Sequence, residues 1–271
     1  MPAVDTLKII YQKRGLPGVS RFMFQRYFAD EPYDYRVIEN FRTYKRLLAG
    51  KSGIEIGGPS AIFSTEVPIY KIVASLDGCN FGTETIWEGS LTEGKNYRYH
   101  DGKVGWQFIR EASDLNGIED EKYDFLLASH ALEHCANPLK TVEEWLRVLK
   151  PSGVLLMVLP DRRFTFDHRR QITSFEHLLE DYQKNVGEDD LTHLDEIIEL
   201  HDLEMDKEVS NIDLTREEFH KRSLENFNNR ALHHHVFDFK LLEKIFDYFG
   251  IRPIDETFAE PLHQVILGRK S

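Results

Sequence analysis

Short apolar runs alternate with polar segments through residues 51–160 of the 271-residue chain. Five of these runs have the length of a strand: 53–56, 72–76, 107–110, 123–128 and 154–159. Several are almost continuously apolar, which is typical of strands with both faces buried in a parallel sheet. The pattern therefore predicts the strands of an α/β core.

A helix is predicted between the last two runs. Asn137 can cap its start, and Pro138 suits its first turn. Its apolar positions recur at helical spacing: Leu139, Val142, Trp145, Leu146 and Leu149. The residues Lys-Pro-Ser-Gly at 150–153 end the helix and lead into the next run. Strand, helix and strand in this order predict a right-handed crossover, with ligands bound at the carboxyl edge of the sheet.

The segments on either side of this core have other patterns. Residues 1–50 predict helices, the clearest at 36–48, where apolar residues recur every three or four positions before Gly50. Residues 161–235 are rich in charge and histidine and contain no strand-like run. They predict helices at 174–184 and 191–203, and we expect them to form an insertion that covers the sheet edge.

The core pattern returns after this insertion. A helix is predicted at 240–249, and strands are predicted at 252–258 and 263–268. Nearby prolines favour an antiparallel hairpin at the margin of the sheet for these two strands. The chain thus divides into four parts: helices at 1–50, the main core at 51–160, a helical insertion at 161–235 and the rest of the core at 236–271.

Composition narrows the class of protein. The net charge of −12, from 34 basic and 46 acidic residues, argues against general nucleic-acid binding, which depends on neutralising phosphates with Lys and Arg. The start of the chain lacks the apolar segment of a secretory signal, and no apolar run approaches the roughly 20 residues that cross a bilayer. Cys79 and Cys135 have no metal-ligand or redox spacing. We therefore predict a cytoplasmic protein without a membrane span.

Glycines follow the first predicted strand. Gly57 and Gly58 allow a tight turn and let a ligand approach the backbone, because neither residue carries a Cβ. Glu55, near the end of the strand, places a carboxylate where it can reach an amine or a ribose hydroxyl. Taken alone, these residues are more typical of a plain tight turn between a strand and a helix.

Polar residues also follow the next predicted strands. Asp77 closes the second run, about 20 residues after the glycines, where a carboxylate can accept hydrogen bonds from both ribose hydroxyls of adenosine. After the third run, Asp114 can accept a hydrogen bond from the adenine amine, and Leu115 can pack on the ring. The alternatives are an Asp-Gly turn at Asp77 and a helix N-cap at Asp114. The fourth run delivers Ser129 and His130 to the same edge of the sheet.

The sequence YDFLLASHALEHCANPLKTVEEWLRVLKPSGVLLMVLPD, at 123–161, resembles the core of class I S-adenosylmethionine-dependent methyltransferases, especially methyltransferase type 11. That group has an S/H-x-L-E-H segment, a helix and an R-V-L-K-P-x-G turn before the next strand. The resemblance covers residues 50–160 closely and residues 236–268 in topology. It implies a Rossmann-like, mostly parallel seven-stranded α/β sheet with helices on both faces, the helical insertion after the fifth strand, and S-adenosyl-L-methionine as cofactor.

The resemblance also implies a role for each part of the chain and for particular residues. Residues 51–160 become the cofactor-binding core, and residues 161–235 become a lid over the acceptor site. Cofactor binding is implied for the positions that match the motifs: Glu55, Gly57, Gly58, Asp77, Asp114, Leu115, Ser129 and His130. The first motif departs from the usual pattern of the family, because Pro59 and Ala61 stand where later glycines are usual.

The insertion supplies candidates for the acceptor site. Methyl transfer is an in-line displacement, and an acceptor hydroxyl needs a base, a role that suits histidine because it titrates near neutral pH. We predict His168, Arg169 and His234 as catalytic residues, because they flank the open edge between the fifth strand and the last helix. Arg169 can pair with an anionic group of the acceptor. The alternative for each histidine is a structural or surface role.

The sequence therefore favours transfer of a methyl group to an oxygen or nitrogen atom of a small-molecule or saccharide-like acceptor. The saccharide rests on segments similar to 159–182 and 233–238 in type 11 methyltransferases found beside glycosyltransferases. One alternative is a non-catalytic module that binds S-adenosylmethionine or S-adenosylhomocysteine. Another is a metal-dependent hydrolase that uses residues of the insertion: His193, His201, Asp202 and the run 233–235. The insertion contains no H-E-x-x-H motif and no pair of histidines four apart, so we predict no bound metal.

Overall fold

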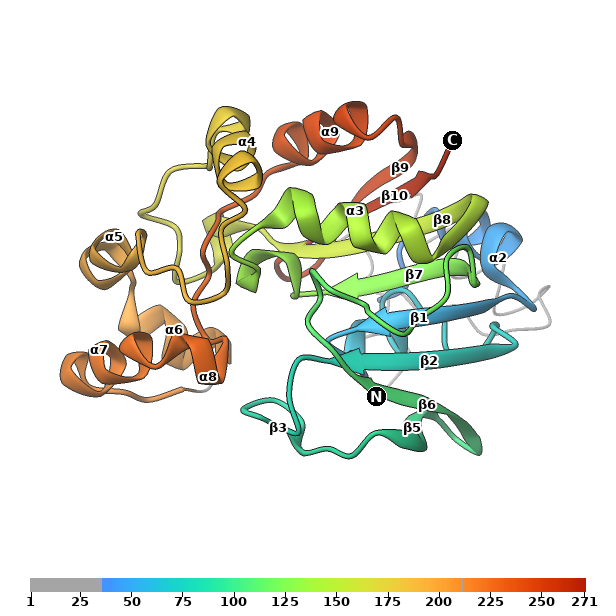
Figure 1. The fold of residues 1–271 in the computed structure, drawn as a ribbon, viewed down its shortest axis with the longest axis horizontal. Coiled ribbons are helices and arrows are strands. Elements are labelled where there is room, and N and C mark those ends of the chain that lie inside the picture. The colour runs from blue at the N-terminus through green and yellow to red at the C-terminus, as the bar shows by residue number, and fades with distance from the viewer. Residues whose placement is uncertain (1–35, 211) are drawn as a thin grey trace, which may run out of the picture.

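A central sheet of eight strands organises the molecule (Figure 1). The computed structural model describes residues 36–210 and 212–271. Across the sheet the strands lie in the order β5-β6-β2-β1-β7-β8-β10-β9. Their bounds, in chain order, are β1 Ser52–Ile56, β2 Ser75–Asn80, β5 Gly94–His100, β6 Lys103–Ile109, β7 Tyr123–Ser129, β8 Leu149–Pro160, β9 Arg252–Ala259 and β10 His263–Arg269. A separate small hairpin pairs β3 (Glu84–Thr85) with β4 (Gly89–Ser90).

Five neighbouring strands, from β6 through β2, β1 and β7 to β8, run parallel. β10 is antiparallel to β8 and to the marginal strand β9, so the predicted hairpin is confirmed. The predicted Rossmann-like, mostly parallel sheet is confirmed as well. Its described part has eight strands rather than seven, because residues 94–100 form β5, antiparallel to β6. This edge strand buries Tyr97 and Tyr99 among polar and exposed residues, so its sequence did not stand out as an apolar run.

Helices cover both faces of the sheet, as predicted (Figure 1). On one face, α3 (Pro138–Val148) and α9 (Phe239–Tyr248) pack in a core that includes Leu126 of β7. On the other face, α2 (Phe41–Leu48) and the 3-10 helix η1 (Ala61–Phe63) pack in a second core that includes Leu127. Neighbouring residues of β7 therefore face opposite cores, which explains why this strand is continuously apolar.

The ends of the helices follow local signals. The Asn137 side chain accepts a hydrogen bond from the amide of Lys140, and Pro138 occupies the first turn of α3, as predicted. Helix α2 begins at Phe41 rather than at residue 36. The helices predicted within residues 1–35 lie outside the described residues.

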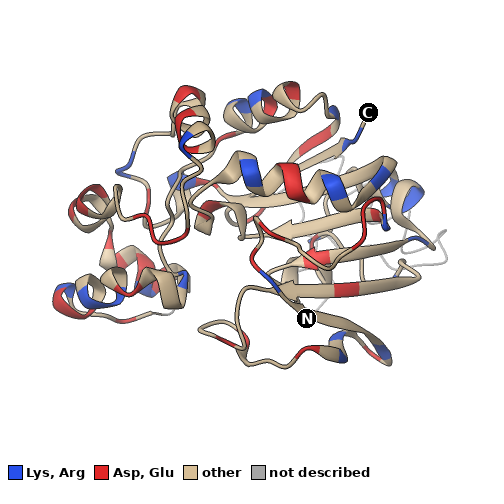
Figure 2. Ribbon diagram, in the orientation of Figure 1, with Lys and Arg blue, Asp and Glu red and all other residues tan. Residues whose placement is uncertain are grey.

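The segment at 161–235 is helical, and its described residues include no strand. It contains η3 Arg162–Phe164, α4 Phe175–Lys184, α5 Leu194–Leu200, α6 Leu203–Ser210, α7 Arg216–Leu224 and α8 Asn226–Asn229. In Figure 1, helices α5 to α8 lie together beyond the ends of β1 and β2. Acidic residues occupy the first turns of α5 and α6 (Figure 2), where the helix dipole favours negative charge. No helix among the described residues is long and apolar enough to cross a membrane.

Candidate active site

A cavity of about 670 Å³ opens where the parallel strands end. Its sheet side includes the last residues of four strands: Ile56 of β1, Asn80 of β2, Ser129 of β7 and Pro160 of β8. Its other side comes from the insertion, including Phe166, Arg230 and His233. In an open sheet with this strand order, ligands bind at the carboxyl ends of the strands, next to the point where the order reverses. The volume is in the range of small-molecule and cofactor sites.

The turn after β1 forms one wall of the cavity. Gly57 lines it and has a φ of +78°, a conformation that glycine adopts without strain. Gly58 has no room for a side chain, because a Cβ there would lie 2.2 Å from the carboxyl carbon of Glu55 and 2.5 Å from the Tyr97 hydroxyl. The close packing of Gly58 on Glu55 thus fixes the path of this turn.

Glu55 lies beneath the turn and is fully buried. Its carboxylate accepts hydrogen bonds from the hydroxyls of Tyr70 and Tyr97, both at 2.6 Å, and from the amide of Ser60 at 3.0 Å. Burial raises the pKa of Glu55, and these hydrogen bonds act in the opposite direction. Glu55 does not line the cavity, so its oxygens hold the glycine turn from below.

Asp77 lies in the middle of β2 rather than at its end. The apolar run at 72–76 mostly precedes the strand, since Val73 is buried in a loop and β2 begins only at Ser75. The carboxylate of Asp77 accepts hydrogen bonds from the amide of Trp106 and the hydroxyl of Tyr123, both at 2.8 Å, and Asp77 does not line the cavity. The strand continues to Asn80, which does.

Asn80 is buried between the sheet and the glycine turn. Its Nδ2 donates a hydrogen bond to the carbonyl of Gly58 at 3.1 Å. Asn80 thus lies at the end of β2, beside the turn after β1. From sequence, the residue at this strand end was expected to bind the ribose. Asn80 was not predicted as a candidate because, with Cys79 and Phe81 as neighbours, it does not belong to a recognisable acidic turn.

Asp114 and Leu115 lie beyond the cavity. Asp114 is exposed, and its carboxylate accepts a hydrogen bond from the amide of Asn116 at 3.2 Å. Leu115 is fully buried in the core on the α3 side. The residues after β6 that line the cavity are instead Arg110, Glu111 and Ala112. Glu111 also connects the sheet to the insertion, because Arg230 donates a hydrogen bond to its carboxylate at 2.5 Å.

Ser129 and His130 both line the cavity at the end of β7. His130 has a φ of +50°, and its Nε2 lies 2.9 Å from Nδ1 of His263, the first residue of β10. Burial, together with the nearby His263 and His233, lowers the pKa of His130 to about 3. The ring is therefore neutral at physiological pH.

The three residues predicted as catalytic lie outside the cavity lining. His168 and Arg169 both contact one carboxylate oxygen of Asp202, at 3.0 Å and 2.5 Å. His234 is buried, with its Nε2 3.0 Å from Nδ2 of Asn226, and burial lowers its pKa to about 4. The neighbouring His233 lines the cavity. Side chains alternate in an extended segment, so adjacent residues of the 233–235 run face different surroundings.

His233 is held by a buried carboxylate. Its Nδ1 lies 2.5 Å from Oδ2 of Asp167, and Nη1 of Arg170 donates to Oδ1 of the same carboxylate at 3.1 Å. Burial raises the pKa of Asp167, but His233 and Arg170 outweigh it and bring the pKa down to about 2. Burial lowers the pKa of His233, but the attraction of Asp167 outweighs it and raises the pKa overall. Asp167 therefore orients the ring and stabilises its protonated form.

Two further groups adjoin His233. Glu133 is fully buried, neither of its carboxylate oxygens has a hydrogen-bond partner, and burial raises its pKa to about 7. His134 packs edge-on to His233 with ring centroids 4.6 Å apart, and its Nδ1 lies 3.1 Å from the carbonyl of Leu232. His134 also packs against Trp87, whose half-exposed indole lines the cavity.

The comparison with protein families identifies the core. The model of a family described as "Methyltransferase domain" matches residues 86–157, which include β5 to β7, α3 and most of β8. This core is a class I methyltransferase domain. The chain is thus an enzyme that uses S-adenosyl-L-methionine, as the sequence analysis predicted.

Similar folds occur among solved structures. An S-adenosylmethionine-dependent methyltransferase of Aquifex aeolicus is 12% identical, with 89% of this chain and 95% of that chain covered and a TM-score of 0.43. One from Thermotoga maritima is 17% identical, with 97% and 99% covered and a TM-score of 0.43. One from Methanosarcina mazei is 16% identical, with 86% and 98% covered and a TM-score of 0.45. No curated protein matches the chain.

Proposed function

We propose that the methyltransferase transfers the methyl group of S-adenosylmethionine to an oxygen or nitrogen atom of a small-molecule or saccharide-like acceptor, with His233 as general base. One observation carries this proposal: His233, oriented by Asp167, lines the same cavity as the glycine turn after β1. The proposed proton acceptor, His233, and the strand ends that we propose bind the cofactor therefore line the same cavity.

The residues at the strand ends fit the cofactor. The turn at Gly57 leaves the backbone open to close approach, and Asn80 offers an amide to the ribose hydroxyls. The segment from Arg110 to Ala112 lies where the adenine would follow, and Ser129 and His130 complete the wall. In this arrangement Glu55 acts indirectly by supporting the turn. The bound cofactor supplies the electrophilic methyl group of its sulfonium.

His233 is suited to remove the acceptor proton. Because Nδ1 is bound to Asp167, Nε2 is the nitrogen that remains to accept a proton from a hydroxyl or an ammonium group in the cavity. The carboxylate of Asp167 then stabilises the imidazolium that forms. The insertion also covers the cavity with apolar groups such as Phe166, which restrict water around the reacting atoms.

The outer part of the cavity supports the acceptor class. Trp87 is 50% exposed and presents a flat aromatic surface, and Glu66 and Thr65 line the same space. A sugar ring has an apolar face that packs on such a surface and hydroxyls that bind to polar side chains of this kind. We also propose a cytoplasmic location, which is supported by the two buried, unpaired cysteines Cys79 and Cys135.

Transfer of a labelled methyl group to a panel of hexosides, amino sugars and small amines tests the proposal. We expect His233→Gln to reduce kcat by about 10²–10⁴-fold, the usual contribution of a general base. Binding of S-adenosylhomocysteine, measured by calorimetry, should change by less than about threefold. His168→Gln, which alters the predicted histidine outside the cavity, should retain most of the turnover. Full turnover in His233→Gln would exclude the base assignment.

A further inference from the structure

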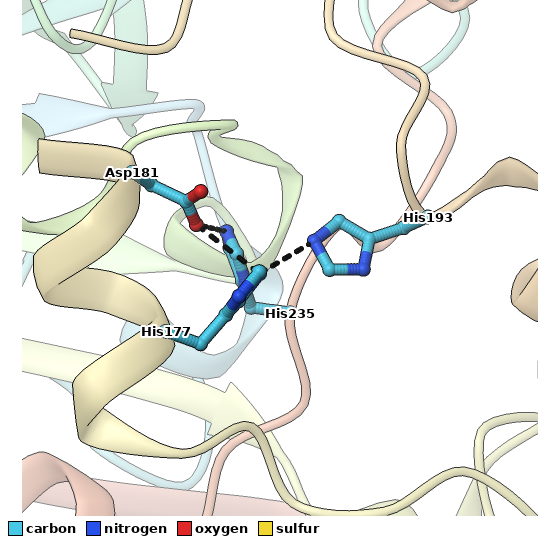
Figure 3. A group of neighbouring side chains, drawn as sticks. All are labelled: His177, Asp181, His193 and His235. Atoms are coloured by element: carbon cyan, nitrogen blue, oxygen red, sulfur yellow. Dashed lines mark hydrogen bonds and ion pairs between the residues drawn. The ribbon is translucent and has the colours of Figure 1, made fainter. Parts of the chain in front are cut away.

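Four side chains from three segments converge beside α4, outside the active-site cavity (Figure 3). His177 and Asp181 lie one turn apart on α4, His193 precedes α5, and His235 belongs to the segment before α9. Nε2 of His177 lies 3.0 Å from Nε2 of His193 and 3.3 Å from Oδ2 of Asp181. Nε2 of His235 lies 3.7 Å from the same Oδ2. In Figure 3 the four groups face one another.

We propose that His177, Asp181, His193 and His235 bind one structural divalent metal ion, with zinc as the ion that fits best. Each residue offers one ligand atom, and these atoms all lie within 4.8 Å of one another. With metal–ligand bonds of about 2.0–2.1 Å, the ligands of a tetrahedral zinc site are about 3.3 Å apart. The distances of 3.0, 3.3 and 3.7 Å in the cluster bracket this separation. Three imidazoles and one carboxylate are ordinary zinc ligands.

A buried atom without a hydrogen-bond partner points to a ligand at this place. The side chain of Asp181 is 10% exposed and that of His235 is 0% exposed. Oδ2 of Asp181, the carboxylate oxygen that faces the other three side chains, has no hydrogen-bond partner. Polar atoms buried without a partner are uncommon in folded proteins and destabilise them. A cation between the four side chains would give Oδ2 a positive partner without protonation of His177 or His235.

The contact between His177 and His193 has the same implication. Two neutral imidazoles at 3.0 Å make a hydrogen bond only if one donates, whereas a metal ion accepts lone pairs from both. Nδ1 of His193 lies 3.9 Å from Oε2 of Glu196, too far for a hydrogen bond, so Glu196 is a nearby negative charge rather than a partner that orients the ring. Nε2 of His235 also lies 3.2 Å from the carbonyl of Ala136, and metal binding would turn it away from that carbonyl.

A metal at this site would join α4, the start of α5 and the 233–235 run. His235 is two residues from His233, so the ion would fix the segment that carries the proposed base. The described residues include a second group of potential ligands: Glu133, His134 and His233. That group belongs to the active site, and Asp167 already occupies Nδ1 of His233 while the carbonyl of Leu232 occupies Nδ1 of His134.

The insertion has no two histidines four positions apart, so its sequence did not predict a metal site. The chain carries a histidine and an aspartate at that spacing, His177 and Asp181, which lie on one side of α4. The other two ligands come from distant parts of the sequence. Of the residues considered for a metal site from sequence, His193 and His235 are in the cluster, whereas His201 pairs with Asp206.

Elemental analysis and metal titration of the full-length protein test the proposal. We expect about one zinc ion per chain after purification from zinc-containing medium. Metal-free protein should bind Zn²⁺ and Co²⁺, with the visible absorption of tetrahedral Co²⁺, and zinc should raise the melting temperature by at least about 5 °C. His177→Gln should weaken Zn²⁺ binding by more than the 10–100-fold typical of an outer-shell change. Histidine 177 is partly exposed, so this variant is expected to fold.

His220→Gln is the matched control, because His220 is an exposed histidine of the insertion. It should retain the metal affinity of the parent. Absence of bound zinc together with failure to bind added Zn²⁺ or Co²⁺ would overturn the proposal, and so would equal loss of affinity in both variants. S-adenosylhomocysteine binding, measured on the same samples, reports separately on the cofactor site and on folding.

Discussion

Asn80→Ala is expected to weaken binding of S-adenosylhomocysteine, whereas Asp77→Asn is expected to leave it nearly unchanged. Asn80 lines the cavity at the end of β2, and Asp77 lies three residues earlier, away from the cavity. The two variants therefore distinguish a ribose site at the strand end from one at the acidic residue that the sequence favours.

The magnitudes follow from the hydrogen bonds of each side chain. Asn80→Ala removes the bond to the Gly58 carbonyl, which positions the turn, and one or two bonds to the ribose. At about 0.5–1.5 kcal/mol for each of these two or three hydrogen bonds, the loss is about 1–4.5 kcal/mol, or about 5–2,000-fold in Kd. Asp77→Asn keeps the shape of the side chain but turns one acceptor into a donor opposite Trp106 or Tyr123. We expect it to lower the free energy of unfolding by about 1–3 kcal/mol and to change Kd by less than threefold.

Isothermal titration calorimetry with S-adenosylhomocysteine measures Kd, and urea denaturation measures stability. Asn80→Asp is the matched variant: a carboxylate keeps acceptors for the ribose hydroxyls but cannot donate to the Gly58 carbonyl, so its loss of affinity measures the contribution of that hydrogen bond. A loss of tenfold or more in Asp77→Asn, with parental affinity in Asn80→Ala, would refute the assignment and place the ribose at Asp77.

Two further predictions concern buried groups around the site. Burial raises the pKa of Glu133 to about 7, so the folded protein binds this proton more tightly than the unfolded chain does. The protonated carboxyl group therefore adds to the free energy of unfolding at low pH, and this addition decreases as the pH rises from about 4.5 to 7. Glu133→Gln should remove that decrease and should stabilise the protein at pH 8 by up to about 3 kcal/mol. Urea denaturation of parent and variant at pH 5 and pH 8 measures the effect. Identical pH dependence of stability in the two proteins would contradict the prediction. Gly58→Ala places a Cβ against Glu55 and should destabilise the fold by about 1–3 kcal/mol, whereas Gly82→Ala, with no atom nearer than 3.5 Å, should cost less than about 1 kcal/mol. Thermal melts of the two glycine variants measure the difference in stability. Equal melting temperatures would show that the turn after β1 shifts to accommodate the added Cβ at little cost.

The sequence was most informative where a local pattern and its environment coincide. The apolar runs of β1, β7 and β8 are buried on both faces, and Asn137 and Pro138 mark the start of α3, so these elements were predicted correctly. The run at 72–76 misled because Val73 is buried by a loop that packs on the core. An apolar run indicates that its residues are buried, but buried residues can lie in a loop as well as in a strand. For this reason the sequence pointed to Asp77 as the residue at the strand end, whereas the strand continues to Asn80, which lines the cavity.

Local patterns were less informative in the insertion. The 233–235 run contains three adjacent histidines, and only tertiary structure shows that His233 lines the cavity while His234 contacts Asn226. The partner of His233, Asp167, lies 66 positions away in the sequence. A contact between residues so far apart depends on how the insertion folds back onto the sheet. Neither residue type nor spacing within the segment encodes it.

Arg170 illustrates why function in this part of the chain is non-local. It is one of four arginines within nine residues, yet it is 1% exposed and its neighbour Arg169 lies at the surface. Its guanidinium donates to the carboxylates of Asp167 and Glu196 and to the carbonyls of the 233–235 run. A buried guanidinium is tolerated only when its donors are satisfied in this way, because the charge has lost its water. Arg170 therefore links the carboxylate that orients His233 to the carboxylate beside His193, and so connects the proposed base to the proposed metal site.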